Sequence, residues 1–313
     1  MSSETIQIAG TDAITQGELL KFKDDFYHLV QQKTTKLGGS SAVMYLPSEG
    51  KTQNIARMGK IELTKVTGRN PSKQFVQYNL DNRQFTKDRF TATVQIDEKD
   101  DINELITSPQ SGLMTNLMNA YNRTIDRVIS EVAVGDVLVG KPSGAPTTVT
   151  AANDGVITVD ATGGMSYDTI QSITENFINN DLQREDFYGT ELIITGREHT
   201  QLMGITQFTN NDYIDSRPVA AGEIRNTGLY GVTWFAGSVS GGITVPNPVL
   251  VEGSTNRSCL ALAPESVALS LQLASLRVEQ SADKVNSKDI TIDMWINGMR
   301  IEGAKVQKIE TTI

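Results

Sequence analysis

The sequence predicts an α+β protein in which one long helix is mounted on a body that is otherwise rich in β-strands. Apolar residues recur every three or four positions across residues 109–134, which predicts a helix there. Pro109 suits the first position of that helix, and Gly135 is expected to end it. Short apolar runs, such as ELIITG at residues 191–196 and SCLALAP at residues 258–264, predict buried strands.

Residues 56–80, ARMGKIELTKVTGRNPSKQFVQYNL, are expected to form two extended arms around a turn of Gly, Asn and Pro residues. Ile61 and Leu63 alternate with polar residues, which is the period of a half-buried strand. A second alternation over residues 90–96 extends the predicted ribbon to residues 53–96. Because a two-stranded ribbon is marginally stable in water, something outside this segment must hold it.

Further elements are predicted on both sides of the ribbon. Residues 16–36 have the apolar spacing of an amphipathic helix. Ser166 is expected to cap another helix, and a short helix is expected from Arg197 onward. Residues 265–280 fit either a helix or a strand, and the tail is predicted to be a hairpin that turns at Asn297-Gly298, since Asn-Gly is a strong turn signal.

Composition limits the class of protein. A chain of 313 residues can form one large domain or two ordinary ones, and 38% hydrophobic but only 6% aromatic content spreads burial over small aliphatic contacts. No run of 18 apolar residues occurs, so no membrane span is predicted, and the N-terminus lacks a signal-peptide pattern. The single cysteine, Cys259, excludes an intrachain disulfide framework and fits a reducing compartment.

Charge is unevenly distributed along the chain. Residues 21–90 contain 13 Lys or Arg against 6 Asp or Glu, a net charge of +7. Because the whole chain carries −9, the remaining residues together carry −16. A basic extension on an acidic body is expected if the extension of each copy lies on the body of another copy. A basic arm for nucleic acid is the alternative, but its lysines lack the aromatic stacking partners of such arms.

The sequence offers no catalytic, cofactor or metal motif: GxSxG, GxGxxG after a strand, the Walker A sequence and HExxH are all absent. Glu198-His199 could include a general base, but no motif places a nucleophile beside it, so a polar helix start is favoured. Cys259 lies in an apolar run, which favours a small buried side chain. The acidic run at residues 97–101 lacks the glycine and ligand spacing of a calcium loop. We therefore predict no enzyme activity, no cofactor and no metal site.

Three stretches carry a resemblance to a known family. NAYNRTIDRVISEVAVGDVLVGKPSG (residues 119–144) resembles the end of a capsid spine helix, and TELIITGREHTQLMG (residues 190–204) resembles the strand and helix that open an axial domain. GLYGVTWFAGS followed by RSCLALAPESVAL resembles the later strands of that domain. In this order the elements resemble the major capsid protein of tailed bacteriophages, whose fold is named after phage HK97.

The resemblance implies an HK97-like fold with an N-terminal arm (1–49), an extended β-hairpin loop (50–96), a peripheral domain with the spine helix (97–161 and 261–313) and an axial domain (162–260). It also implies pentamers and hexamers of an icosahedral shell in the virion, assembled in the host cytoplasm around packaged double-stranded DNA that is not bound sequence-specifically. The arm is expected to be too short for a fused scaffolding segment, so a separate scaffolding protein is expected. A portal is a further expected partner, and a decoration protein is an optional one.

The extended loop is expected to lie over the adjacent subunit and to supply the contact that the ribbon requires. The candidate contact residues are Lys60, Ile61, Leu63, Lys65, Arg69, Lys73, Val76 and Tyr78. The three lysines among them, Lys60, Lys65 and Lys73, match the cross-linking lysine of the fold's namesake by residue type only, and we do not predict that bond.

Three alternatives stay open at this point. An encapsulin-type shell of a bacterial compartment would share the fold but house cargo enzymes. A soluble hydrolase would need a polar pocket at His199, and a nucleic-acid binding protein would use residues 21–90.

Overall fold

The computed structural model describes residues 31–48, 50–67, 69, 72–73, 75–97, 109–140, 144–182, 190–194, 196–205, 219–220, 223–224, 232–236, 250–252, 256–281 and 287–312. The chain divides into two compact units. The first comprises residues 1–33, 90–122 and 273–294, and the second comprises residues 34–89, 123–272 and 295–313. No helix in the described part of the chain is long and apolar enough to cross a bilayer.

The long helix α3 spans Pro109–Val134, the bounds that the sequence predicted. The backbone N–H of Gly135 closes its last turn by donating to the carbonyl of Glu131 at 2.8 Å. The first half of the helix lies in the first unit, where Leu117 packs in a cluster with Ile96, Ile290 and Ile292. These four side chains form the buried core of that unit.

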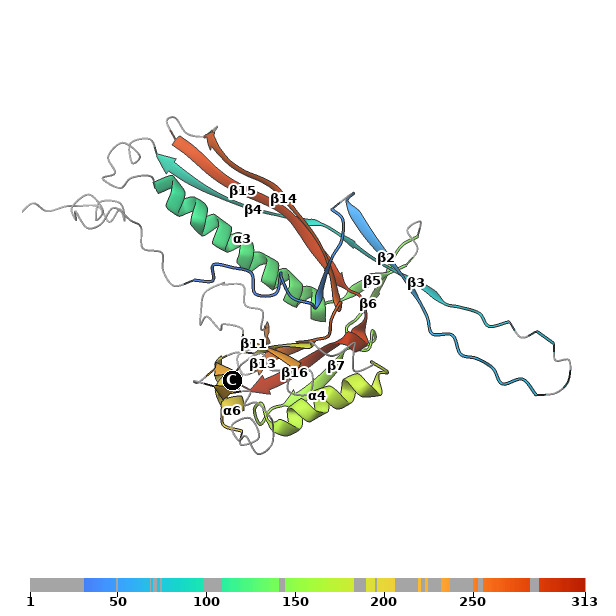
Figure 1. Ribbon diagram of the computed structural model, residues 1–313. Helices are drawn as coiled ribbons and strands as arrows, with labels where there is room; N and C mark the ends of the chain where they lie inside the picture. Colours follow the sequence, from blue (N-terminus) through green and yellow to red (C-terminus); the bar gives the residue numbers. More distant parts are fainter. Residues whose placement is uncertain are drawn as a thin grey trace, which may run out of the picture. The chain divides into compact units, whose positions relative to one another are not determined.

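A four-stranded sheet has the order β1-β14-β15-β4, with β1 at Val43–Tyr45, β14 at Val267–Gln280, β15 at Ser287–Arg300 and β4 at Asp88–Asp97 (Figure 1). The segment 265–280, which the sequence left between helix and strand, is therefore a strand over most of its length. β1 pairs in parallel with the start of β14, from Val43 opposite Val267 to Tyr45 opposite Leu269.

The main core of the second unit is a six-stranded mixed sheet with the path β11-β8-β13-β16-β7 and β12 paired to β13. The strands are β7 (Ile157–Ala161), β8 (Thr190–Ile194), β11 (Val232–Ala236), β12 (Leu250–Glu252), β13 (Asn256–Leu262) and β16 (Val306–Thr312). Side chains on β8, β13 and β16, including Leu192, Leu260 and Ile309, are fully buried. The runs ELIITG and SCLALAP are thus the buried strands that the sequence predicted.

Two helices accompany this sheet. α4 (Tyr167–Asn179) begins with a capping box in which Ser166 accepts from the backbone N–H of Thr169, as expected for a cap, and it buries Ile170, Ile173 and Phe177. α6 (Gly196–Met203) is the predicted short helix after β8. The short strands β9 (Val219–Ala220) and β10 (Glu223–Ile224) form a separate antiparallel pair, and the single-turn helix η1 (Gly303–Lys305) precedes β16.

A third sheet has the order β2-β3-β5-β6. β2 (Thr52–Met58) and β3 (Leu80–Thr86) pair antiparallel over their whole lengths, from Thr52 opposite Thr86 to Met58 opposite Leu80. β5 (Val137–Val139) and β6 (Thr147–Val149) extend the sheet on the β3 side. The chain between β2 and β3 is the extended loop seen in Figure 1.

The prediction that residues 90–96 belong to the ribbon is wrong. β4 pairs with β15 instead of with either arm of the loop. The reason is its apolar face: Ala92, Val94 and Ile96 pack into the cluster that contains Leu117, so this strand is completed by the long helix of its own chain. The ribbon therefore ends at Thr86.

The predicted hairpin turn at Asn297-Gly298 is also wrong, because β15 runs straight through both residues. The side chain of Asn297 donates to the carbonyl of Thr86 at 2.7 Å and to the Asp88 carboxylate at 3.0 Å. Glycine is required at position 298 by close packing, since a Cβ there would overlap the carbonyl oxygen of Ala268. Asn297 and Gly298 therefore allow close contact between neighbouring strands and do not form a turn.

The predicted helix over residues 16–36 is wrong for residues 31–36, which form no helix, while residues 16–30 lie outside the described residues. The backbone N–H groups of Lys36 and Leu37 both donate to the carboxylate of Asp126, at 2.8 and 3.0 Å, so they are not used for a helical turn. This carboxylate fastens the N-terminal segment to α3.

Candidate functional site: the extended loop and its root

The extended loop comprises residues 59–79, between the paired strands β2 and β3. The last backbone contact of the ladder is the N–H of Gly59, which donates to the carbonyl of Asn79 at 2.8 Å. Beyond this contact the described residues of both arms form no strand. The expectation that Ile61 and Leu63 lie in a half-buried strand is therefore wrong for the single chain: Leu63 is 100% exposed.

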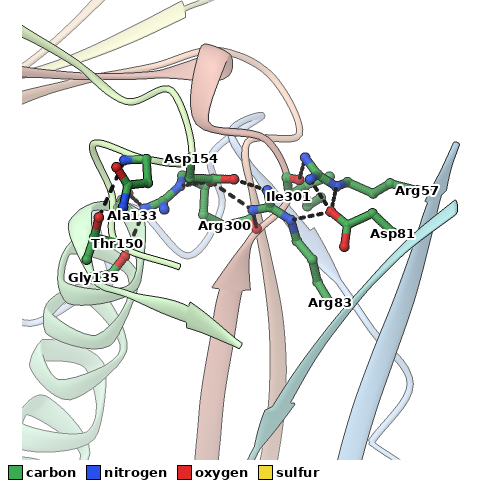
Figure 2. Close-up of polar contacts among 10 residues, drawn as sticks. Arg57, Asp81, Arg83, Ala133, Gly135, Thr150, Asp154, Arg300 and Ile301 are labelled. Atoms are coloured by element: carbon green, nitrogen blue, oxygen red, sulfur yellow. Dashed lines mark hydrogen bonds and ion pairs between the residues drawn. The ribbon is translucent and has the colours of Figure 1, made fainter. Parts of the chain in front are cut away.

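The root of the loop is a group of buried or half-buried charges formed by Arg57, Asp81, Arg83, Asp154 and Arg300 (Figure 2). Arg57 comes from β2, and Asp81 and Arg83 come from β3. Asp154 precedes β7, and Arg300 is the last residue of β15. Four separate parts of the second unit thus meet where the loop begins.

Asp154 stands between two arginines in this group. Arg83 Nη1 donates to Asp154 Oδ2 at 2.9 Å, and Arg83 Nη2 pairs with the other carboxylate oxygen. Arg300 Nε donates to Asp154 Oδ2 at 2.7 Å. Both arginine side chains are fully buried and that of Asp154 is 6% exposed. A buried carboxylate held by two guanidinium groups fixes the direction of each arginine.

Burial acts to raise the pKa of the Asp154 carboxyl, but hydrogen bonds and charge from Arg83 and Arg300 outweigh it and hold that pKa below its ordinary value. Burial lowers the pKa of Arg300, and the hydrogen bond to Asp154 opposes this shift. The carboxylate is therefore charged at neutral pH, as the paired arginines require.

Arg300 connects this group to the end of the long helix. Its Nη1 donates to the carbonyls of Ala133 and Gly135 at 2.8 and 3.0 Å (Figure 2). The last carbonyls of a helix have no partner within it and carry partial negative charge, so a guanidinium is a favourable cap there. Arg83 in turn donates to the carbonyl of Arg300 at 2.7 Å. The base of the loop and the end of α3 are therefore joined through two side chains.

The outer pair of the root, Arg57 and Asp81, ties the two strands of the loop to each other and to the chain after β15. Arg57 Nε donates to Asp81 Oδ2 at 3.2 Å, and Arg57 Nη1 donates to the carbonyl of Ile301 at 3.1 Å. None of the five root residues was among the predicted site residues. Arg83, Asp154 and Arg300 are separated by 71 to 217 positions in the sequence, and no local pattern links them.

Beyond its root the loop is exposed. All eight predicted contact residues are exposed on the single chain: Lys60, Ile61, Leu63, Lys65, Arg69, Lys73, Val76 and Tyr78. Phe75, which the sequence interpretation did not select, is 89% exposed and is the second most exposed large apolar residue of the loop after Leu63. In the sequence Phe75 follows the polar residues Lys73 and Gln74 and directly precedes Val76, so it does not fit an alternation of apolar and polar residues.

The four cations of the loop differ in their surroundings. Lys60 Nζ lies 2.6 Å from Asp181 Oδ2 of the same chain, just after α4, and this hydrogen bond raises the pKa of Lys60 and lowers that of Asp181. Both side chains are more than three-quarters exposed, so the pair contributes little to folding. Lys65, Arg69 and Lys73 form no ion pair with any residue that the structure describes.

The residues considered for catalysis do not form a site. Glu198 is buried, accepts from the Thr311 hydroxyl at 3.2 Å and lies 3.6 Å from Arg257, so it is held by structural partners. Cys259 is buried, as expected. The side chains of His199 and Asp97 and residues 98–101 lie outside the described residues. Within the described residues, no group of three His, Cys, Asp or Glu side chains could hold a metal ion.

Comparison with known proteins agrees with this geometry. A family profile described as "Phage capsid protein" matches residues 14–313. No curated protein sequence matches the chain. Solved structures with the same fold include the Cyanophage Pam1 capsid, at 14% identity and TM-score 0.67, covering 97% of this chain and 99% of that one. The mature capsid of bacteriophage PhiM1 aligns at 13% identity and TM-score 0.63, covering 93% and 90%. The acid-stable capsid of Helicobacter pylori bacteriophage KHP30 aligns at 8% identity and TM-score 0.63, covering 99% and 100%.

Proposed function

Because the chain belongs to the phage capsid protein family, has the HK97-like fold and is a structural subunit of a capsid shell, we propose that its extended loop joins neighbouring subunits of that shell. The observation that carries the proposal is the contrast within the loop. Its root holds Arg83, Asp154 and Arg300 in buried ion pairs, whereas Leu63 and Phe75 beyond the root are almost wholly exposed. Large exposed apolar side chains on one segment are typical of an interaction surface.

The eight contact residues and Phe75 would supply both kinds of attraction. Ile61, Leu63, Val76 and Tyr78 would bury apolar surface on the neighbour, while the cations would meet its acidic body. Burial of about 300 Å² of apolar surface per loop contributes roughly 7 kcal/mol before the entropy of ordering is subtracted. A contact of this size, repeated around a shell, is strong collectively and reversible individually.

The rest of the assembly follows as part of the proposal. Subunits would form pentamers and hexamers of an icosahedral shell around double-stranded DNA, assembled in the host cytoplasm with a separate scaffolding protein and a portal. A decoration protein outside would be an optional further partner. The acidic body, at −16 without residues 21–90, would limit adhesion of DNA to the inner wall. The role is structural, without catalysis. The encapsulin alternative is not favoured, because the family matched over nearly the whole chain is that of phage capsids.

The domain assignment is likewise proposed: an arm at 1–49, a peripheral domain at 97–161 and 261–313, and an axial domain at 162–260. Strands β8, β11, β12 and β13 of the six-stranded sheet fall almost entirely in the axial range and support it, whereas β7 and β16 of the same sheet fall in the peripheral ranges. The loop assignment at 50–96 is shortened by the pairing of β4, which leaves residues 52–86 as the loop with its root.

The test is to replace residues 60–78 by Asn-Gly, which closes Gly59 and Asn79 into a two-residue turn and keeps Arg57, Asp81 and Arg83. We expect soluble, folded subunits with unchanged circular dichroism that form no shells in electron micrographs. Shells of normal yield and stability from this variant would contradict the proposal. A wider deletion would be uninformative, because it removes the root.

A further inference from the structure

Lys87 is the single residue between two strands that belong to different sheets. β3 ends at Thr86 in the β2-β3-β5-β6 sheet, and β4 begins at Asp88 in the β1-β14-β15-β4 sheet. The backbone N–H of Lys87 donates to the carbonyl of Lys51 at 3.3 Å, which continues the pairing of β2 and β3 by one residue. The paired strands of the loop therefore end at Lys87, where the chain changes sheets.

The side chain of Lys87 is buried although it carries a charge. It is 7% exposed, and its ammonium group donates to the carbonyl of Ser48 at 2.8 Å and to the Ser48 hydroxyl at 3.0 Å. No carboxylate among the described residues forms an ion pair with it. Lysine is rarely buried without a counter-charge, because removing an ammonium group from water is costly. An apolar side chain would avoid this cost, so the value of the lysine lies in what its ammonium group holds.

The ammonium group joins the two ends of the loop segment. Ser48 lies before β2, so its contact with Lys87 ties the entry of this segment to its exit. Ser48 Oγ also donates to Gln272 Oε1 of β14 at 3.1 Å. The Asn297 side chain on β15 donates to the carbonyl of the residue before Lys87 and to the carboxylate of the residue after it, at 2.7 and 3.0 Å. Ser48, Lys87 and Asn297 thus form a second attachment of the loop, which fastens it to β14 and β15.

The second attachment lies away from the root. Lys87 comes four positions after Arg83, which is about 13 Å along an extended strand. A pair of strands held at one point can turn about that point, whereas two separate points fix its direction. Ten residues beyond Arg57, an extended arm reaches at most about 33 Å from the root. A displacement of the second attachment is therefore roughly 2.5 times larger at that distance.

Building on the proposed function, in which the loop reaches a neighbouring subunit, we propose that Lys87 is a positioning residue that sets the direction of the extended loop. Its ammonium group holds Ser48 and so fixes the β2–β3 pair at the second attachment, while the root fixes it at the first. Because Lys87 is buried, it acts through the strands whose ends it joins and not by contact with another subunit.

The test measures the direction of the loop in unassembled subunits. Spin labels are placed on Glu62→Cys in the loop and on Gln171→Cys on α4, both exposed positions, and the distribution of distances between them is measured by pulsed electron paramagnetic resonance. The natural Cys259 is buried and is not labelled. Lys87→Met keeps the length of the side chain but removes its charge, and it should widen the distribution about twofold or more. Lys51→Met changes an exposed lysine beside it and is the matched control, which should leave the width unchanged.

A loss of stability alone would not widen the distribution in chains that remain folded, so this measurement separates positioning from a general structural role. If the Lys87→Met chain does not fold, Ser48→Ala decides. It removes one acceptor of the ammonium group and the bond to β14, and it should widen the distribution in the same way. An unchanged distribution in the folded Lys87→Met chain would overturn the inference, as would an equal widening in Lys51→Met. Where Lys87→Met does not fold, an unchanged distribution in Ser48→Ala would overturn it.

The outcomes separate the two proposals. If the loop-shortened chain still forms normal shells, the proposed role of the loop fails whatever Lys87 does. If that chain does not assemble and Lys87→Met leaves the distribution unchanged, only the positioning role of Lys87 fails.

Discussion

The root and the far end of the extended loop use similar charged residues in opposite surroundings. At the root, Arg83 and Arg300 are fully buried and share Asp154. At the far end, Lys65 and Lys73 are exposed and have no ion-pair partner among the described residues. The apolar residues follow the same division: Phe85, on β3, is buried with Ala268 and Met299, whereas Phe75 is 89% exposed.

This difference separates what one chain completes from what, under the proposed function, it leaves for a partner. Buried charges are tolerated only when they are paired and hydrogen-bonded, and the root meets this condition within the second unit. A long exposed apolar and basic segment without a pairing strand gains little stability alone. The same loop thus has a base held by ion pairs and an exposed end, which suits its proposed role of reaching another subunit in a defined direction.

The largest expected effect comes from breaking the root. Asp154→Asn removes the charge that two buried guanidinium groups share, and loss of one member of a buried ion pair costs about 3–5 kcal/mol of unfolding free energy. Urea unfolding followed by circular dichroism would measure it, in the loop-shortened chain so that assembly does not interfere. Glu175→Gln, an exposed carboxylate on α4, is the control, and its effect should stay within about 0.5 kcal/mol. Equal effects would show that the root is not a structural centre.

A smaller effect is expected at the far end, and it should appear in assembly rather than in folding. Ile61 and Ile178 are matched, at 54% and 55% exposed on the single chain, but only Ile61 is on the loop. Ile61→Ala should weaken assembly by about 1.5 kcal/mol per contact, roughly a tenfold rise in the concentration at which shells form. Light scattering against subunit concentration measures this. Ile178→Ala should leave unchanged the subunit concentration at which shells form. A similar rise in this concentration for both variants would mean that the loop residue matters no more than any other exposed apolar residue.

Acid should weaken the root by protonating the Asp154 carboxylate. The pKa of Asp154 is lower in the folded chain than in the unfolded chain, where it is near 3.9. Its contribution to stability is therefore fully present above about pH 4 and is lost as the pH falls through the lower folded-state value. Unfolding free energy measured from pH 6 to pH 2 should fall more steeply in the parent chain than in Asp154→Asn. Identical slopes would mean that the carboxylate is not stabilised by its arginines.

The smallest effect is expected for the exposed pair of Lys60 and Asp181. Asp181→Asn should leave thermal unfolding of the subunit unchanged, because both side chains are largely in solvent. A clear loss of thermal stability would show that this pair fixes the loop within its own chain. The root alone would then not account for the direction of the loop.

Much of this architecture could be predicted from local sequence signals. The helix at 109–134 has strong periodicity and clear end signals, and the buried strands β8 and β13 are continuous apolar runs. The errors in the fold at residues 31–36, 90–96 and 297–298 have one physical cause, which is contact between distant segments. The alternation of apolar and polar residues over 90–96 is the same whether this strand pairs in a hairpin or with β15. Asn297-Gly298 has the sequence of a turn, and only its close packing against Ala268 shows why glycine is needed in a strand there. The root could not be predicted at all, because no local pattern marks three charges that only the fold brings together.

Backbone hydrogen exchange tests the central claim most directly, because it compares root and far end in one experiment. The account predicts that the backbone N–H groups hydrogen-bonded between β2 and β3 are protected both in unassembled subunits and in assembled shells. Those of residues 60–67 and 75–79 should exchange freely in subunits and become protected only in shells. Protection of these residues in the lone subunit, or free exchange in the assembled shell, would contradict the claim that a neighbouring subunit completes the loop.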